Sequence, residues 1–183
     1  MFPMPGYTCR VRLKAGYFAM FVDPQNKIQH LAGLRQKVAA AQAAGLTVVF
    51  GNGCFDLIHV GHIRYLQGAK ALGDILVVGI NGDASVSALK GEGRPLQPEL
   101  ERAEIIASME CVDYVVVFDA LTVAGLLTVL KPDIHAKGTD YTIDNVPERE
   151  VVRGFGGRVA IVGDEKAHSS RDLVSAILLK MSR

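Results

Sequence analysis

Short apolar runs alternate with helical patterns along most of this chain of 183 residues. Apolar residues spaced three and four apart over 28–44, closed by Gly45 as a C-terminal cap, predict a helix. The apolar run 46–50 that follows is rich in β-branched residues and ends at Gly51-Asn52-Gly53, which predicts a buried strand. Similar runs predict four more strands, at residues 75–80, 114–118, 133–136 and 159–162.

Helical patterns separate these strands. They cover residues 63–72, 98–110, 122–130 and 169–181, with a further short helix before Lys90. Strands that are apolar throughout and separated by helices are typical of a parallel sheet covered on both faces. We therefore expect an α/β fold with a doubly wound, Rossmann-like parallel sheet of about five strands. Ligands of such sheets bind beyond the carboxyl ends of the strands, near the point where the strand order reverses.

Composition indicates one globular domain. Hydrophobic residues make up 49% of the chain and charged residues 21%, which is ordinary for a protein with a packed core. We expect this domain to span residues 26–183. Residues 1–25 show neither helical nor strand periodicity, which predicts a poorly ordered N-terminal arm.

Charge and cysteine content exclude several classes of function. A formal net charge of +1 gives no global reason to expect a nucleic acid partner, so any phosphate binding must be local. The three cysteines, Cys9, Cys54 and Cys111, have no zinc-site spacing, and their odd number argues against a disulfide framework, so we expect a cytoplasmic protein. No apolar run approaches the roughly 20 residues of a membrane span, and no secretory signal is evident, so no membrane partner is expected.

The segment after the first predicted strand carries the candidate chemistry. It reads G-x-F-D-x-x-H-x-G-H from Gly53 to His62 and runs directly into a helix. A helix N-terminus offers free N–H groups and the positive end of the dipole to an anion, and imidazoles there can donate hydrogen bonds to phosphate oxygens. One histidine alone at a helix start is more often a cap, but the whole combination predicts a triphosphate site. Neither the GxxxxGK[ST] loop nor the GxGxxG pattern is present.

This motif resembles that of the cytidylyltransferase-type (HxGH) nucleotidyltransferase superfamily. The likeness extends over residues 28–180 to the adenylyltransferase domain of the bacterial ADP-heptose synthesis enzyme, through VVFGNGCFDLIHVGHIRYLQGAKALGD, INGDASVSALKGEGRP, ERAEIIASMECVDYVVVF and LKPDIHAKGTDYT. The resemblance implies transfer of AMP from ATP to D-glycero-β-D-manno-heptose 1-phosphate, with Mg²⁺ accompanying the ATP, in a homodimer. Because no sugar-kinase domain is present, the chain resembles a stand-alone form.

Within the motif, we expect His59 and His62 to be catalytic and to carry the α- and β-phosphates. The surrounding residues are expected to contact the nucleotide, namely Asn52, Gly53, Cys54, Phe55, Asp56 and Gly61. Two kinds of role are equally open for Asp56. In a functional role it orients a histidine or holds Mg²⁺ through water, and in a structural role it caps the helix entry.

Three cations and one carboxylate outside the motif are further candidates. By resemblance, Lys90 is a catalytic residue that reaches the reacting phosphates, with Arg94 nearby to bind substrate; a solvated turn is the alternative. Arg102 lies near a helix start, where the helix dipole disfavours a cation, so a catalytic contact with phosphate or a carboxylate partner is expected. Asp83 faces either the acceptor or the metal through water, or else caps the following helix.

Two later segments complete the expected nucleotide site. Lys137, Gly138 and Asp140 match the family's KGxDY element near nucleotide or sugar, with Thr139 where glycine is usual. Lys137 binds either phosphate or sugar hydroxyls by this resemblance, and a structural role is the equal alternative. Ser169 and Ser170 lie where relatives bind triphosphate with hydroxyls, although one of them is equally well explained as an N-cap. The chain keeps two hydroxyls followed by Arg171, and it lacks the arginine that the glycerol branch of the superfamily carries a few residues earlier. This departure favours the heptose branch over the glycerol branch.

The main enzymatic alternative keeps the chemistry and changes the substrates, as a cytidylyltransferase acting on glycerol 3-phosphate or another polyol phosphate. An alternative of another class is a nucleotide-binding regulatory protein without turnover. The presence of both histidines favours the enzyme.

Overall fold

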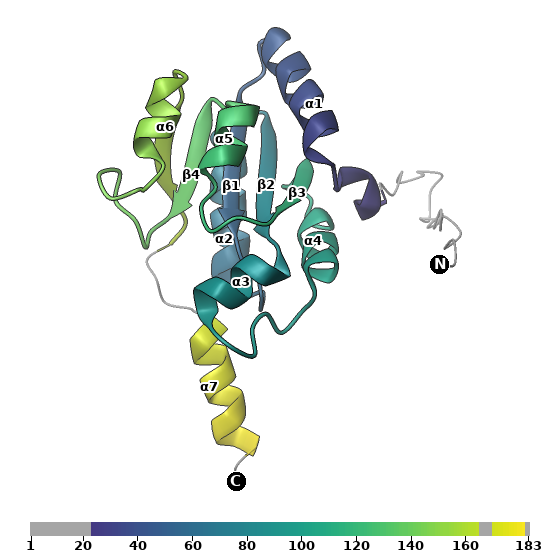
Figure 1. The fold of residues 1–183 in the computed structure, drawn as a ribbon, viewed down its shortest axis with the longest axis vertical. Coiled ribbons are helices and arrows are strands. Elements are labelled where there is room, and N and C mark those ends of the chain that lie inside the picture. The colour runs from purple at the N-terminus through teal and green to yellow at the C-terminus, as the bar shows by residue number, and fades with distance from the viewer. Residues whose placement is uncertain (1–22, 165–169, 182–183) are drawn as a thin grey trace, which may run out of the picture.

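A computed structural model describes residues 23–164 and 170–181, and within them five parallel strands form a single sheet (Figure 1). The strands are β1 (Val48–Gly53), β2 (Ile75–Asn81), β3 (Tyr114–Phe118), β4 (Ile134–Gly138) and β5 (Arg158–Val162). Their order in the sheet is β3-β2-β1-β4-β5, and every pairing is parallel. This confirms the predicted doubly wound fold and places the reversal of strand order between β1 and β4.

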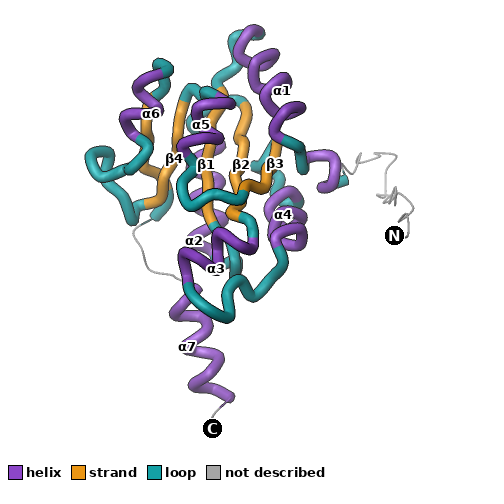
Figure 2. Tube along the Cα trace, in the orientation of Figure 1, coloured by secondary structure: helices purple, strands orange, loops and turns teal. Residues whose placement is uncertain are grey.

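Helices cover both faces of the sheet (Figure 2). They are α1 (Leu31–Ala43), α2 (Val60–Lys70), α3 (Asp83–Lys90), α4 (Glu99–Ala107), α5 (Ala124–Leu130), α6 (Arg149–Gly154) and α7 (Ser170–Met181), preceded by a 3₁₀ turn, η1 (Pro24–Lys27). Apolar residues of α2 and α4 pack on one face in one buried cluster. Those of α1, α5 and α6 pack on the other face in a second cluster. The two cores together bury the strands on both sides, as their continuous apolar sequences require.

Several predicted boundaries shift in the structure. The helix predicted from residue 28 begins at Leu31, because Ile28 instead forms an isolated parallel bridge with Val115 at the sheet edge. Strand β1 runs on to Gly53, so Asn52 and Gly53 belong to the strand rather than to the loop. Helix α6 was not predicted, since its six residues are too few to show a clear period. Most of the predicted arm lies outside the described residues, and its last residues, from Asp23, enter η1.

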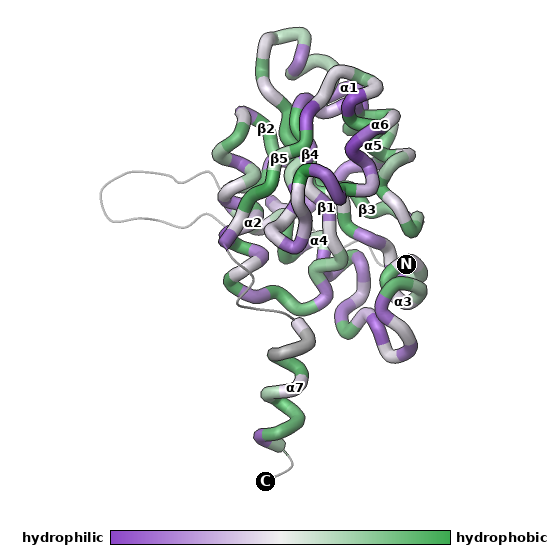
Figure 3. Tube along the Cα trace, turned by 90° about the vertical axis from the view of Figure 1, so that its left-hand side faces the viewer, coloured by the Kyte–Doolittle hydropathy of each residue, from purple (hydrophilic) through white to green (hydrophobic). Residues whose placement is uncertain are grey.

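Helix α7 begins at the carboxyl edge of the sheet and extends away from it (Figure 1). The hydroxyl of Ser170 donates a 3.1 Å hydrogen bond to the carbonyl of Leu57, which ties the start of α7 to the loop after β1. Farther along, apolar side chains of the helix are exposed, including Leu178, Leu179 and Met181. Figure 3 shows the hydrophobic stretches of this projecting helix.

A tyrosine hydroxyl joins β1 to β4 at the point where the strand order reverses. Pairing of these two strands ends at Gly51 with Ala136. Just beyond, the Tyr65 hydroxyl accepts a hydrogen bond from the backbone N–H of Asn52 at 3.2 Å and donates one to the carbonyl of Ala136 at 2.9 Å. Since Tyr65 lies on α2, this contact also fixes the helix against the two strands.

Gly51 makes room for this hydroxyl. A Cβ atom at position 51 would lie 2.6 Å from the Tyr65 oxygen, closer than real Cβ contacts come. A glycine is therefore required by the approach of α2 to β1, which is one of the reasons for glycine inside a strand.

We predict that Tyr65→Phe lowers the free energy of unfolding by about 1–3 kcal/mol, because a buried hydroxyl that both donates and accepts is lost. Urea denaturation measures this. Tyr114→Phe is the matched control, since the Tyr114 hydroxyl has no hydrogen bond within the described part of the chain. An equal loss in the two variants would contradict a special role for the Tyr65 hydroxyl.

Candidate active site

The two histidines of the motif lie together at the start of α2. His59 is the N-cap, with an extended backbone, and His62 is the third residue of the helix. The backbone N–H of His59 donates to Nδ1 of His62 over 3.3 Å, and the imidazole rings stack with their centroids 3.8 Å apart. The helix entry thus brings both imidazoles to the carboxyl end of β1, where its first N–H groups and dipole favour an anion.

His62 is held as a neutral hydrogen-bond donor. Burial lowers its pKa to about 4, and the neighbouring His59 and the charge of Lys90 act in the same direction. Because its Nδ1 accepts the His59 N–H, the neutral ring carries its proton on Nε2. At neutral pH Nε2 of His62 can therefore donate a hydrogen bond to a ligand oxygen, while the ring carries no positive charge.

Phe55 shapes the turn that leads to this helix. Its backbone adopts a left-handed φ of 48°, uncommon for a residue other than glycine. The ring is buried in the core on the α2 side and meets His62 edge to face, with ring centroids 5.2 Å apart. The burial of this ring stabilises the turn that presents the histidines.

Asp56 is fully buried and ties the loop before α4 to the motif. Its carboxylate accepts hydrogen bonds from the Arg94 guanidinium at 2.5 Å and from the backbone N–H groups of Leu96 at 2.5 Å and Gln97 at 3.4 Å. Burial raises the pKa of Asp56, but these hydrogen bonds outweigh burial and hold the pKa below its usual value. Asp56 and Arg94, predicted as nucleotide and substrate contacts, are thus paired with each other in this structure.

Arg102 is completely buried beneath the same region. Its guanidinium donates to the Asp83 carboxylate at 2.6 Å and to three backbone carbonyls, those of Cys54, Asn81 and Gln97 at 2.5, 2.8 and 2.9 Å. The prediction from the helix dipole required an anionic partner, and Asp83 is that partner. The geometry favours a role in holding the ends of β1 and β2 together over direct contact with phosphate.

Lys90 ends α3, is exposed, and acts electrostatically on the motif. Its positive charge contributes to the lowered pKa of His62. Burial raises the pKa of the Cys54 thiol, which the charges of Lys90 and Arg102 lower only in part. Lys90 is therefore an exposed cation of the predicted set whose charge acts on His62.

A second group of polar residues lies where β1 and β4 end. Oδ1 of Asn52 is 3.2 Å from Nε2 of His135 and 3.4 Å from Nζ of Lys137, whose ammonium is 3.7 Å from the Glu148 carboxylate. Asn52 and Lys137 were predicted nucleotide contacts, and the structure brings them together. His135 and Glu148 were not predicted, although the alternation of a strand places His135 and Lys137 on one face.

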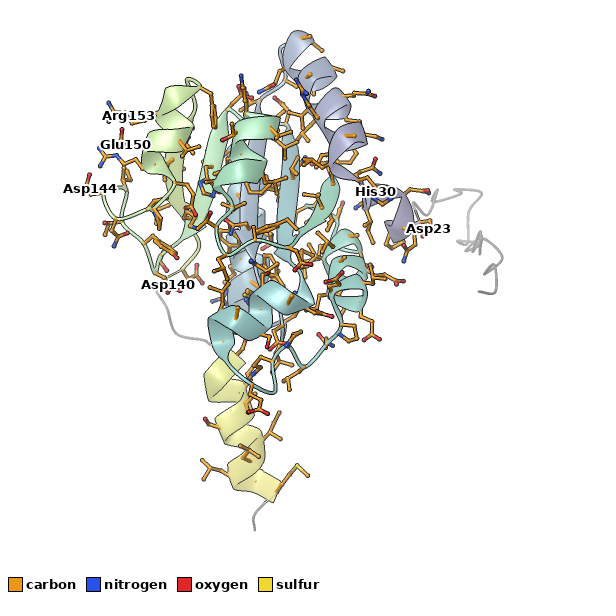
Figure 4. The ribbon with its side chains drawn as sticks, in the orientation of Figure 1. Asp23, His30, Asp140, Asp144, Glu150 and Arg153 are labelled. Atoms are coloured by element: carbon orange, nitrogen blue, oxygen red, sulfur yellow. The ribbon has the colours of Figure 1, made fainter. Side chains whose placement is uncertain are left out.

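The remaining predicted residues lie at the same edge or outside the description. Gly138 ends β4, and Asp140 is exposed in the turn that follows (Figure 4). Gly61 lies in the first turn of α2 and is partly exposed. Ser170 begins α7 beside the motif, and Ser169 lies outside the described residues.

Comparison with known families agrees with this geometry. The family model described as cytidylyltransferase-like matches residues 50–179, which include the motif, both histidines and the β4 segment. The chain belongs to the cytidylyltransferase-like family. The predicted nucleotidyltransferase class is confirmed by this membership.

Two curated relatives are similar to most of this chain. It is 49% identical over 156 residues to the bifunctional protein HldE of Geobacter metallireducens, covering 85% of this chain and 32% of the relative. It is 50% identical over 152 residues to HldE of Geobacter sulfurreducens, covering 83% and 31%. The chain thus spans about a third of the length of these relatives. The predicted resemblance to a domain of the ADP-heptose synthesis enzyme is confirmed.

A solved structure shares the fold. The lipopolysaccharide core biosynthesis protein of Thermoplasma volcanium is 31% identical, with a TM-score of 0.54, over 64% of this chain and 94% of that one. Within residues 23–164 and 170–181, no helix has the length and apolar character to cross a membrane. The same residues contain no group of three metal-ligating side chains.

We predict that His62→Asn weakens the pH dependence of stability between about pH 6.5 and pH 4. The unfolded chain protonates His62 near its ordinary pKa of 6.5, whereas the folded protein does so only near 4, so unfolding takes up a proton in this window. Stability from this group is therefore complete above pH 6.5 and is lost as the pH falls toward 4. Thermal melting at several pH values measures the slope.

Asparagine is chosen because its Oδ1 can replace Nδ1 as acceptor of the His59 N–H without titrating. His135, whose pKa is also lowered by burial, is unchanged and contributes equally to both proteins. Parallel melting profiles for the variant and the wild type would show that His62 does not titrate as its environment predicts.

Proposed function

We propose that this protein transfers AMP from ATP to D-glycero-β-D-manno-heptose 1-phosphate, giving ADP-heptose and pyrophosphate. The observation that carries the proposal is the stacked pair His59 and His62 at the start of α2, beside the carboxyl end of β1. The choice of substrates is supported by about 50% identity to proteins named HldE over most of this chain. A further support is the structural likeness to a protein of lipopolysaccharide core biosynthesis.

In this reaction a phosphate oxygen of the sugar phosphate forms a bond to the α-phosphorus of ATP. The bond from that phosphorus to the bridging oxygen breaks, and pyrophosphate leaves with the electron pair. No covalent nucleophile of the protein is needed, so catalysis comes from positioning and from stabilising charge on the transferred and departing phosphates.

The motif supplies groups suited to this task. The Nε2–H of neutral His62 and the helix N-terminus donate to phosphate oxygens, and Lys90 adds the positive charge that the neutral imidazole lacks. We assign Arg102 and Asp56 positioning roles, because both are buried and hold the surrounding loops through hydrogen bonds.

Magnesium is proposed to arrive with ATP, bound chiefly by the phosphates, as Mg²⁺ commonly is. Asp56 does not fit a metal-contacting role, since its carboxylate already accepts three hydrogen bonds and is buried. Asp83 fits better as a contact through water, because its side chain is 44% exposed although one oxygen is bonded to Arg102.

A homodimer and a cytoplasmic location complete the proposal. The apolar side chains exposed along α7 support self-association, because contiguous exposed apolar residues commonly mark an interface. Sedimentation velocity measures the oligomeric state. The cytoplasmic location is supported by three cysteines without a disulfide pattern.

We predict pyrophosphate release when the protein is given Mg²⁺, ATP and D-glycero-β-D-manno-heptose 1-phosphate. CTP, glycerol 3-phosphate and other sugar or polyol phosphates are tested in turn. Faster turnover of CTP with glycerol 3-phosphate would replace the proposal with the cytidylyltransferase alternative. Absence of turnover with every pair, together with tight nucleotide binding, would favour a regulatory protein.

His62→Asn provides the control for this assay. Loss of one donor that stabilises transition-state charge lowers kcat by roughly 10²–10³-fold. Since the variant keeps the acceptor for the His59 N–H, a fold-wide collapse is not expected. An unchanged kcat would mean that His62 is structural.

A further inference from the structure

Four polar side chains form a compact cluster that the nucleotide-phosphate motif does not use. We call Asn52, His135, Lys137 and Glu148 the Asn52 cluster. His135 is fully buried, and the side chains of Lys137 and Glu148 are only 9% and 8% exposed, whereas Asn52 is partly exposed. Burial of this many polar groups is costly unless each has a partner, so their arrangement requires an explanation.

The Lys137 ammonium determines the orientation of the Asn52 amide and, through it, the tautomer of His135. An ammonium only donates, so the Asn52 atom 3.4 Å from Nζ is the amide oxygen. The His135 nitrogen 3.2 Å from the same oxygen must then carry the proton, which makes His135 the Nε2–H tautomer. With its oxygen held by two donors, Asn52 can contact a ligand only through its amide N–H₂, which makes no hydrogen bond within the described residues. Two donors of Asn52 are thereby available at the end of β1.

The Glu148 carboxylate can still accept a hydrogen bond, although its charge is paired with the Lys137 ammonium. Oε2 of Glu148 is buried, lies 3.7 Å from the Lys137 ammonium, and makes no hydrogen bond within the described residues. Because the ion pair is too long for a hydrogen bond, a ligand hydroxyl can still donate one to this oxygen. Donors of Asn52 and Lys137 beside an acceptor of Glu148 match hydroxyl groups, which donate and accept at once.

The charges within the cluster cancel, which favours a neutral ligand. The positive charge of Lys137 is offset by Glu148, and burial lowers the pKa of His135 to about 3, so this ring adds no charge. A phosphate would meet the Glu148 carboxylate and be repelled. The phosphates are instead served by the positive end of α2 and by Lys90.

The position of the cluster places it beside the phosphate site. Phe50, Asn52 and the β4 residues His135 and Lys137 lie on the face covered by α1, α5 and α6, as the Phe50–His135 ring contact indicates. The two motif histidines lie on α2, which covers the other face. The two motif histidines, which are proposed to bind phosphate, and the Asn52 cluster therefore lie on opposite sides of the carboxyl end of β1.

We propose that Asn52, Lys137 and Glu148 bind the hydroxyl groups of a sugar ring, and that His135 is the positioning residue that fixes the Asn52 amide. This proposal rests on the proposed nucleotidyl transfer. Two rings carry such hydroxyls: the ribose of the nucleotide and the ring of the sugar phosphate. The chemistry of recognition is the same for both, and the experiment separates them.

The experiment compares His135→Leu, which removes the donor, with His135→Gln, whose amide can restore it. Calorimetric titration with Mg–ATP and with Mg–2′,3′-dideoxy-ATP measures nucleotide affinity without turnover. Steady-state kinetics with the sugar phosphate measures its KM. Glu148→Gln removes the acceptor charge, and Glu150→Gln is its matched control, because Glu150 lies exposed on the outer side of α6 (Figure 4).

His135→Leu is expected to weaken binding of one ligand about three- to tenfold, as loss of one well-placed hydrogen bond does. His135→Gln is expected to restore most of that affinity. Because leucine also removes the buried, unbonded Nδ1, the Leu variant should be at least as resistant to urea as the wild type. Glu148→Gln should weaken the same ligand about tenfold or more, while Glu150→Gln leaves it unchanged.

If the ring is the ribose, the effect of His135→Leu appears with ATP and disappears with the dideoxy nucleotide. If it is the acceptor sugar, ATP affinity stays constant and the KM for the sugar phosphate rises. Unchanged values for both ligands would overturn the proposal, as would a loss of stability in His135→Leu with no rescue by glutamine. Ribose-dependent coupling without any sugar turnover would support the cluster and reject the heptose reaction.

Discussion

The hydroxyl of Tyr65, bonded to both β1 and β4, is the contact on which the rest of the site depends. It lies where the pairing of these strands ends, and it belongs to the helix that carries His59 and His62. Residues three apart on a helix share a face, so fixing Tyr65 also fixes the rotation of His62. Gly51 is the counterpart of this contact, because any larger residue would occupy the place of the hydroxyl.

Two buried charged residues hold the loops of the site in place. Arg102 and Asp56 are each fully buried, and each is bonded to backbone groups of segments that are distant in sequence. A buried charge is tolerated only with well-placed partners, so these contacts restrict the loops to one arrangement. The loops between these elements are therefore held against the ends of β1 and β2, close to the start of α2.

The sequence was sufficient for the fold because the strands are continuously apolar and the helices separate them regularly. The sequence also predicted that His59 and His62 lie together at the start of a helix, since glycines and helix caps leave a local pattern. It could not assign Arg102 and Asp56, because three of the four partners of Arg102 lie 19 to 48 residues away in the sequence and those of Asp56 lie 38 to 41 residues away. The sequence does not distinguish a charged residue that contacts a phosphate from one that pairs with a buried carboxylate. His135 was missed for a related reason: its partner Asn52 is 83 residues away.

The alternation of side chains along β1 explains how one strand end can serve two chemistries. Gly51 and Gly53 face α2, where the absence of side chains admits the Tyr65 hydroxyl and the Phe55 ring. Asn52 faces the opposite side, toward His135 and Lys137 of β4, and the charge of Lys137 is balanced by Glu148 before α6. A period of two places the proposed phosphate site and the Asn52 cluster on either side of a single strand. Because the strand is buried in the middle of the sheet, the spacing between the two is set by the core rather than by a mobile loop.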